Sequence, residues 1–212
     1  EVGRVEALVE GDPAGDGPDG RRWRHAVALQ VGEVLDVHRL DAALDHLNRL
    51  GGPPARFQLV PGASDGSTRV VLVRGPLAPP QFTLAADNGG SRDFGRGQID
   101  LDLRLDEPLG LLDQLRLTVG SNADPGRAAS RSVGLHYSLP WREHLFGLSL
   151  GAAWRRQPVQ GTTLQFESRG RDRTLELRWD WAAWRRGDAK LGPWAAWRDR
   201  RTRSHLDGTE LI

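Results

Sequence analysis

The sequence predicts a small α+β module followed by an all-β part, which we interpret as the incomplete wall of an antiparallel transmembrane β-barrel. Three observations predict this fold class. Residues 1–75 mix helix and strand patterns, residues 81–212 alternate apolar and polar side chains almost throughout, and the proline-rich stretch 76–80 separates them. We therefore expect two domains, 1–75 and 81–212, joined by a linker at 76–80.

The first domain should contain one strong helix. Residues 37–50 carry apolar side chains at helical spacing, Asp36 can cap the helix start, and Gly51-Gly52-Pro53 can end it. Apolar runs typical of strands occur at 2–9, 55–60 and 68–73. The order strand, irregular piece, helix, strand, strand describes a module near the low size limit for an independent core.

The second domain alternates with a period of two residues. In residues 99–106 every odd position is apolar and every even position is charged, which fits a strand with one apolar and one polar face. The pattern predicts seven strands, at about 81–89, 95–107, 113–122, 130–141, 144–157, 171–186 and 189–205, with a continuation of the fifth at 162–168 left open. Such lengths suit a bilayer crossing, which needs about 9–11 residues, better than the roughly 5–6 residues of soluble strands.

Aromatic and charged residues of these strands fit a membrane barrel. Seven of the eight Trp follow residue 140, and Trp141, Trp154, Trp184 and Trp197 lie near predicted strand ends, where an interfacial aromatic girdle would place them. The side chains expected to face lipid are Leu101, Leu103, Leu148, Leu177 and Trp179. The pore-lining residues are predicted to be Asp100, Asp102, Arg104, Arg116, Glu176, Arg178 and Asp180.

Composition excludes several other classes of protein. The 212 residues include no Cys, which excludes disulfide scaffolds, Cys-liganded zinc and cysteine nucleophiles. No apolar run reaches the ~20 residues of a membrane-spanning helix. The 29 basic and 28 acidic side chains are mixed along the chain, so no overall field attracts nucleic acid. The arginine-rich stretch near the C-terminus is likewise interrupted by aspartates, and we expect its arginines to face the barrel lumen or to lie in extracellular loops.

No motif predicts catalysis, a cofactor or a metal site. Residues 15–20 match a dinucleotide-binding glycine pattern, but Pro18 lacks an amide donor and the neighbouring aspartates would repel phosphate. His136 and His144 could face each other across a hairpin, yet no third metal ligand is evident. We therefore expect a protein that is not an enzyme.

Motifs in a fixed order along the chain support a family resemblance. Residues 35–50 and 58–67 resemble the second POTRA domain of two-partner secretion transporters, outer-membrane proteins that export filamentous haemagglutinins, haemolysins and contact-dependent inhibition toxins. Residues 87–97, 107–113 and 131–140 resemble the early barrel strands of the same family. The positions that carry the barrel resemblance are Asp87, Gly89, Pro108, Leu109, Gly110, Asp113, Tyr137 and Pro140.

The resemblance implies a fold and a function. It implies that residues 1–75 are the second of two POTRA domains, that residues 81–212 supply about seven of about sixteen barrel strands, and that the chain is a segment of a longer protein. It further implies a translocator of the type V two-partner secretion pathway in the outer membrane of a Gram-negative bacterium, with the POTRA domain in the periplasm. The implied partners are a large β-helical exoprotein and outer-membrane lipid, with no cofactor and no nucleic acid, and the complete protein would be a monomer.

Capture of the exported partner would use an exposed sheet edge, because an extended peptide can add to such an edge as a further strand. The residues expected to offer this edge and an adjacent groove are Arg56, Phe57, Gln58, Leu59 and Val60 of the strand, with Leu40, Leu44 and Leu47 of the helix. For Leu44, Leu47, Leu59 and Val60, packing in the module core is the alternative that we expect.

Two other functions are compatible with the sequence. An outer-membrane protein assembly factor of the wider POTRA-barrel superfamily would share both predicted domain types. A soluble β-sandwich module that binds carbohydrate would use its Trp residues to stack on sugar rings.

Overall fold

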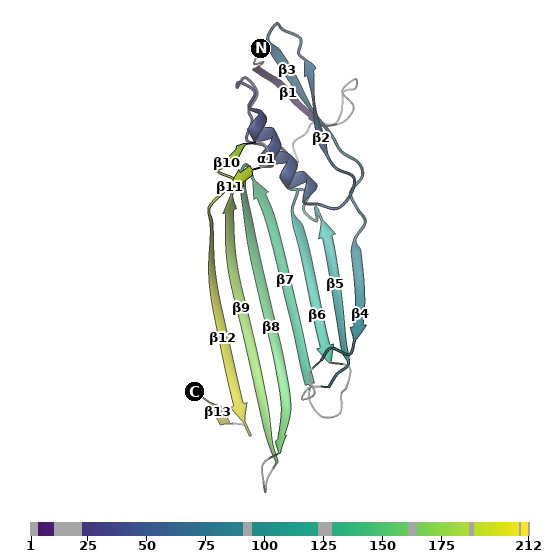
Figure 1. Cartoon of the computed structure of the whole chain (residues 1–212), viewed down its shortest axis with the longest axis vertical. Helices are drawn as coiled ribbons and strands as arrows, with labels where there is room; N and C mark the ends of the chain where they lie inside the picture. Colours follow the sequence, from purple (N-terminus) through teal and green to yellow (C-terminus); the bar gives the residue numbers. More distant parts are fainter. Residues whose placement is uncertain are drawn as a thin grey trace.

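The computed structural model describes residues 4–10, 23–90, 95–122, 129–160, 165–186, 189–207 and 209–211. Within this part of the chain, a three-stranded sheet with one α-helix lies at one end of an eight-stranded antiparallel sheet, with a short hairpin beside the helix (Figure 1). The glycine-rich stretch 15–20, with its dinucleotide-like pattern, lies outside the described residues.

The α+β module has the element order expected from the sequence. It consists of strand β1 (Arg4–Glu10), the 3-10 turn η1 (Arg24–Ala26), helix α1 (Val37–Asn48), and strands β2 (Arg56–Pro61) and β3 (Ser67–Val73). Strand β3 is central, since it pairs in parallel with β1 and antiparallel with β2.

A side chain caps the start of α1, and backbone hydrogen bonds close its end. At its start, the Asp36 carboxylate accepts the backbone N–H of His38 at 2.9 Å, which confirms the expected N-cap. The helix ends at Asn48, before the predicted Gly51-Gly52 stop. The last turn tightens there, because the N–H of Leu50 donates to the Leu47 carbonyl three residues back at 3.2 Å. The Asn48 side-chain oxygen then accepts the N–H of Ala55 at 2.7 Å and links the helix end to the segment that leads into β2.

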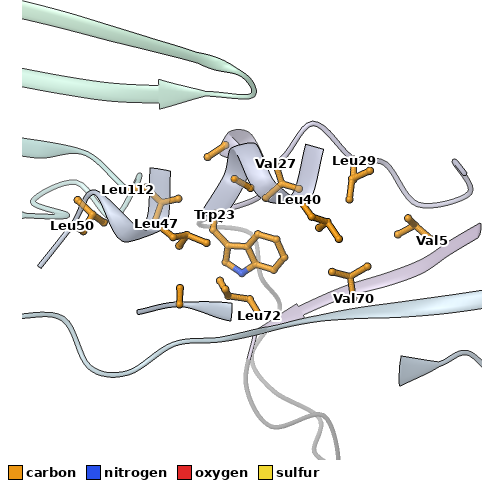
Figure 2. Packing of buried hydrophobic residues seen from close by; sticks show 13 residues of the cluster. Val5, Trp23, Val27, Leu29, Leu40, Leu47, Leu50, Val70, Leu72 and Leu112 are labelled. Carbon is orange, nitrogen blue, oxygen red and sulfur yellow. The ribbon is translucent and has the colours of Figure 1, made fainter. Parts of the chain in front are cut away.

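Trp23 occupies the centre of the module core (Figure 2). Its side chain is fully buried, and its ring centroid lies 5.8 Å from that of Phe57. Leu40 of α1 and Leu72 of β3 belong to the same cluster, and full burial of such a side chain contributes roughly 1.5–3 kcal/mol. Leu112 completes the cluster from a turn of the large sheet, so the module core extends into the second domain.

The large sheet is an antiparallel meander. Its strands are β4 (Gln81–Asp87), β5 (Gln98–Asp106), β6 (Gln114–Asn122), β7 (Ala129–Trp141), β8 (His144–Gln160), β9 (Gln165–Trp181), β12 (Trp194–Leu206) and β13 (Thr209–Leu211). Strands β4 and β13 lie at its two edges and do not pair with each other, so the sheet is open. The seven long strands form one continuous sheet, which contradicts a β-sandwich of two packed sheets.

The predicted strand boundaries are wrong in two places, at the turn after β8 and at the connection between β9 and β12. Residues 165–168 belong to β9 and not to a continuation of the fifth strand, because Gln160 of β8 pairs with Gln165 and the two strands form one long hairpin. A separate hairpin, β10 (Trp184–Arg186) with β11 (Ala189–Leu191), takes up the end of predicted strand 171–186 and the start of predicted strand 189–205. The chain leaves the sheet at Trp181, whose N–H donates to the Pro193 carbonyl at 3.0 Å, and re-enters it at Trp194.

The turns that join β5 to β6, β7 to β8 and β9 to β12 all lie at the end of the large sheet next to the module (Figure 1). The strands extend from this turn end to the opposite, far end. Neither helical segment within the described ranges combines the length and apolar character needed to cross a bilayer.

Candidate functional site

The cross-strand register gives the large sheet one apolar face. Directly paired residues share a face, and six leucine and phenylalanine side chains align across six neighbouring strands: Phe82, Leu103, Leu117, Leu135, Leu150 and Leu175. The other residues expected to face lipid lie on this same face, which we call the apolar face. Leu101 pairs with Leu84 and Val119, and Leu148 pairs with Leu177.

The seven predicted pore-lining residues all lie on the opposite face, which we call the polar face. Arg116 contacts Asp102 with a nitrogen–oxygen distance of 2.7 Å across β5 and β6. Arg178 contacts Asp180 at 2.7 Å on β9. Acidic and basic groups therefore neutralise each other locally along this face, and solvent screens each of these pairs.

Two further groups of the polar face were missed by the sequence reasoning. Arg198 of β12 contacts Glu176 with a shortest distance of 2.5 Å. Asp172 is 7% exposed, accepts a hydrogen bond from Thr202 at 2.6 Å and forms an ion pair with Arg155. The alternation of apolar and polar residues in the sequence places these residues on the polar face. The pairing register of the strands is needed to show which of them contact each other.

Among the residues that the structure describes, strand β2 pairs with β3 alone and so lies at one edge of the three-stranded sheet. The N–H of Gly62 donates to Ser67 at 3.0 Å, and alternate residues of an antiparallel pair point their N–H groups toward the partner strand. In this register the N–H groups of Gln58 and Val60 face β3, while those of Phe57 and Leu59 face outward. The edge thus presents two free backbone donors, followed by Pro61, which has none.

The groove expected beside β2 is filled by the module's own core. Leu40 and Leu47 are 4% and 5% exposed and pack in the Trp23 cluster, so neither has surface to offer a ligand. This burial contradicts the groove prediction for Leu40 and confirms the core packing expected for Leu47. Leu44 is half-buried against the same cluster. Leu59 is 50% exposed, contrary to the core packing expected for it. Trp23 was not identified from the sequence as a core residue, because it lies in an irregular segment without the apolar spacing of a helix or strand.

The motif residues 107–113 form a hydrogen-bonded turn between β5 and β6. The buried Asp113 carboxylate accepts the backbone N–H groups of Leu109 at 3.2 Å and Leu111 at 3.1 Å, and the Tyr137 hydroxyl also hydrogen-bonds it. The N–H of Glu107 donates to the Asp113 carbonyl at 2.7 Å, and Gly110 supplies a positive φ of 70°. Satisfying this many donors with one side chain explains why the turn needs an aspartate.

Side chains of the module hold this turn at the junction of the two domains. Arg49, in the cap of α1, donates to the Leu112 carbonyl at 2.8 Å and to the Ser138 hydroxyl at 2.6 Å. His25 contacts the Leu111 carbonyl at 2.7 Å through Nε2. Arg74 and Glu107 form a further ion pair across the domain boundary. The α+β module and the large sheet are therefore fixed to each other by these hydrogen bonds and by the shared core.

His46 of α1 binds the neighbouring turn between β7 and β8. Its Nε2 lies 2.9 Å from the Arg142 carbonyl, to which the neutral ring donates a hydrogen bond. Burial disfavours the charged form and lowers the pKa of His46 from 6.5 to about 4. His46 is thus a neutral structural contact of the junction.

The histidines do not assemble a metal site. His136 lies opposite Ser149 on the polar face, whereas His144 lies opposite Trp141 on the apolar face, so the two do not face each other as the sequence allowed. Among the residues that the structure describes, no group of three or more potential ligands could hold a metal ion.

Aromatic side chains gather at the turn end of the apolar face. We call Trp141, His144, Trp179 and Trp181 the turn-end aromatic band; Trp141, His144 and Trp181 align across three strands. The rings of Trp179 and Trp181 stack with centroids 6.4 Å apart. Trp154 lies near the far end of the same face.

Comparison with known proteins matches this architecture. The chain is 26% identical over 191 residues to the outer membrane transporter CdiB-2 of Burkholderia pseudomallei, which covers 89% of this chain and 33% of the relative. It is 32% identical over 111 residues to the hemolysin transporter protein HpmB of Proteus mirabilis, which covers 52% of this chain and 20% of the relative. The chain thus spans about a third or less of the length of these curated relatives.

The fold also matches a solved structure. CdiB from Escherichia coli superposes with a TM-score of 0.88 at 24% identity, which covers 99% of this chain and 39% of that one. The sequence profile of the haemolysin secretion/activation proteins ShlB/FhaC/HecB matches residues 66–212. The resemblance found in the sequence is confirmed, and the outer-membrane and transport roles expected from it are those in the relatives' names. The chain belongs to the ShlB/FhaC/HecB family of haemolysin secretion/activation proteins.

Proposed function

We propose that the complete protein is an outer-membrane translocator of the two-partner secretion type, which exports a large β-helical exoprotein. The observation that carries this proposal is a single sheet with one apolar and one charged face, fixed at its turn end to an α+β module. Membrane barrels expose such an apolar face to lipid and enclose the polar face around water. In this proposal residues 1–75 are a POTRA domain in the periplasm, 76–80 are its linker, and 81–212 begin the barrel.

The apolar face would contact lipid and the polar face would line the pore. The seven charged positions named from the sequence would then meet the passing chain as closely spaced charges of both signs. Such a surface has no continuous apolar region and no region of a single charge, so an unfolded polypeptide would bind it only weakly. Transport without a nucleotide or other cofactor is part of this proposal, as is a monomeric barrel.

Capture of the exoprotein would occur at the free edge of β2. The outward N–H groups of Phe57 and Leu59 can pair with an extended segment whatever its sequence. Because Trp23 fills the space beneath α1, the recognition would rest on the backbone of this edge and on exposed side chains such as Leu59, not on a deep groove.

The decisive variant is Leu59→Pro in the full-length protein, with Leu59→Ala as the matched control. Proline removes one outward donor but no bond of the β2–β3 ladder, while alanine removes the same side chain and keeps the donor. We expect Leu59→Pro to reduce export of the exoprotein by at least about tenfold and Leu59→Ala to leave it near normal, since two edge bonds orient the incoming strand.

Export is measured as exoprotein in the medium, after heat-modifiability on gels has shown that each variant is folded in the outer membrane. Normal export by a folded Leu59→Pro variant would contradict capture at this edge. Equal loss in both variants would assign the effect to the side chain and not to strand addition.

A further inference from the structure

Seven arginines gather on the apolar face, near the far end of the sheet. They come from β7, β8, β9 and β12, and we call them the arginine patch: Arg131, Arg156, Arg169, Arg171, Arg173, Arg201 and Arg203. Their strands are inner strands of the sheet, so pairing at either edge would leave this face uncovered (Figure 1). A transmembrane barrel needs no such charge on the face that carries its leucine rows.

The patch places like charges directly opposite each other. Arg171 pairs with Arg203 and Arg173 pairs with Arg201 across β9 and β12, while Arg156 pairs with Arg169 across β8 and β9. Directly opposed like charges destabilise a sheet unless something neutralises them. Three such pairs on one face therefore indicate that anionic groups, of the protein itself or of a ligand, belong beside them.

The protein itself neutralises only part of this charge. Glu167 forms ion pairs with Arg156, at 2.7 Å, and with Arg169, and Asp199 contacts Arg201 at 3.1 Å. Within the described part of the chain, Arg131 and Arg173 form no ion pair.

An exposed aromatic ring lies in the middle of the patch. Trp154 is 40% exposed, pairs with Arg131 on one side and Arg171 on the other, and has the Arg171 guanidinium 5.7 Å from its ring centroid. These residues, with Val119 and Val133, line an open groove of about 1160 Å³. The groove thus combines apolar walls with several guanidinium groups, the combination that suits an amphiphile with an anionic head.

The position of the patch follows from the proposed function, on which this inference rests. Trp181 of the turn-end aromatic band and Arg171 are ten positions apart on β9, about 33 Å along the strand. At the usual tilt of roughly 35–45° this separation is about 23–27 Å across the membrane, close to the ~25 Å height of the apolar band of a barrel. The patch then lies at the lipid headgroups of the leaflet farther from the module.

We propose that the arginine patch binds the phosphate groups of a membrane lipid of this outer leaflet, whose acyl chains lie along the neighbouring leucine rows. Guanidinium groups bind phosphate oxygens in pairs of charge-assisted hydrogen bonds. Two or more phosphates per lipid would match the adjacent Arg–Arg pairs. The bound lipid would offset their repulsion and stabilise the β8–β9–β12 part of the wall.

The test compares two triple variants of the full-length protein purified in detergent. Arg131→Gln/Arg171→Gln/Arg173→Gln removes charge from the patch, and Arg116→Gln/Arg198→Gln/Arg200→Gln removes the same charge from the polar face. Binding of diphosphoryl lipid A, dephosphorylated lipid A and phosphatidylethanolamine is measured by native mass spectrometry on protein shown to be folded by heat-modifiability.

We expect the unchanged protein and the polar-face variant to bind diphosphoryl lipid A at least about tenfold more tightly than either other lipid, and the patch variant to lose this preference. Equal binding of the phosphorylated and dephosphorylated lipids by the unchanged protein would overturn the proposal. So would tight binding of inorganic pyrophosphate alone, which would show a site for a free anion. Failure of the protein to insert into bilayers would instead contradict the proposed function, so the two failures are distinguishable.

Discussion

His46 shows how one buried side chain can make the domain junction sensitive to pH. The unfolded chain titrates this imidazole near 6.5, whereas burial lowers its pKa to about 4 in the folded protein. Between these values the unfolded state binds the extra proton. The contribution of neutral His46 is therefore complete above pH ~6.5 and is lost as the pH falls toward 4, with an upper limit of about 3 kcal/mol.

We predict that His46→Gln flattens this acid sensitivity. Glutamine can still donate to the Arg142 carbonyl but does not titrate, whereas His38→Gln removes an exposed histidine of the same helix and is the control. The measurement is thermal unfolding of the full-length protein in detergent, followed by circular dichroism between pH 4 and 7. If the unchanged protein and His46→Gln lose stability in parallel on acidification, another group is responsible.

At the scale of the element, a single strand of the large sheet carries two incompatible environments on alternate residues. Leu148 of β8 aligns with Leu177 and Tyr137 on the apolar face, whereas Ser149 aligns with Glu176 and His136 on the polar face. A one-residue shift in register would exchange these environments for the whole strand. The register of β8 is therefore set by both neighbours.

We predict that the same substitution has opposite consequences at these two neighbouring positions. Leu148→Arg should destabilise the folded barrel by about 2–4 kcal/mol, because the guanidinium would lie near the bilayer midplane. Ser149→Arg places the same charge in the aqueous lumen and should have little effect beyond loss of the 2.9 Å hydrogen bond between Ser149 and His136. Reversible unfolding in lipid vesicles measures both, and equal destabilisation would refute the assignment of faces.

At the scale of the whole molecule, the charges of the polar face offset each other. Arg116 with Asp102 and Arg198 with Glu176 lie on different strand pairs, so the mixing of signs extends across the sheet. Ions in the pore would pass closely spaced pairs of opposite charge and would experience no strong field of one sign. Removing the negative charges should therefore leave the arginines to set the ion preference of the pore.

We predict that the complete barrel is weakly ion-selective and that Asp102→Asn/Glu176→Gln makes it prefer anions. The removal of two carboxylates leaves Arg116 and Arg198 without their acidic partners in the lumen. Reversal potentials in a salt gradient across a planar bilayer measure this preference. Strong selectivity of the unchanged barrel would show that other strands dominate the pore.

Much of the fold could be predicted because the signals are local. Alternation over 99–106 specifies a strand with two unlike faces, and Asp36 before an apolar periodic run specifies a helix start. Both signals need only neighbouring residues. The polar-face positions follow from the same alternation of apolar and polar residues along each strand, and they do not depend on which strands are neighbours.

The tertiary structure decided what depends on residues distant in sequence. Trp23 reaches the core only through an irregular segment, and it makes Leu40 and Leu47 unavailable to a ligand. The junction likewise joins Arg49 to Leu112, and the arginine patch joins Arg131 to Arg171 through Trp154. Register and packing create these contacts, and no local pattern of apolar and polar residues encodes which distant partners meet.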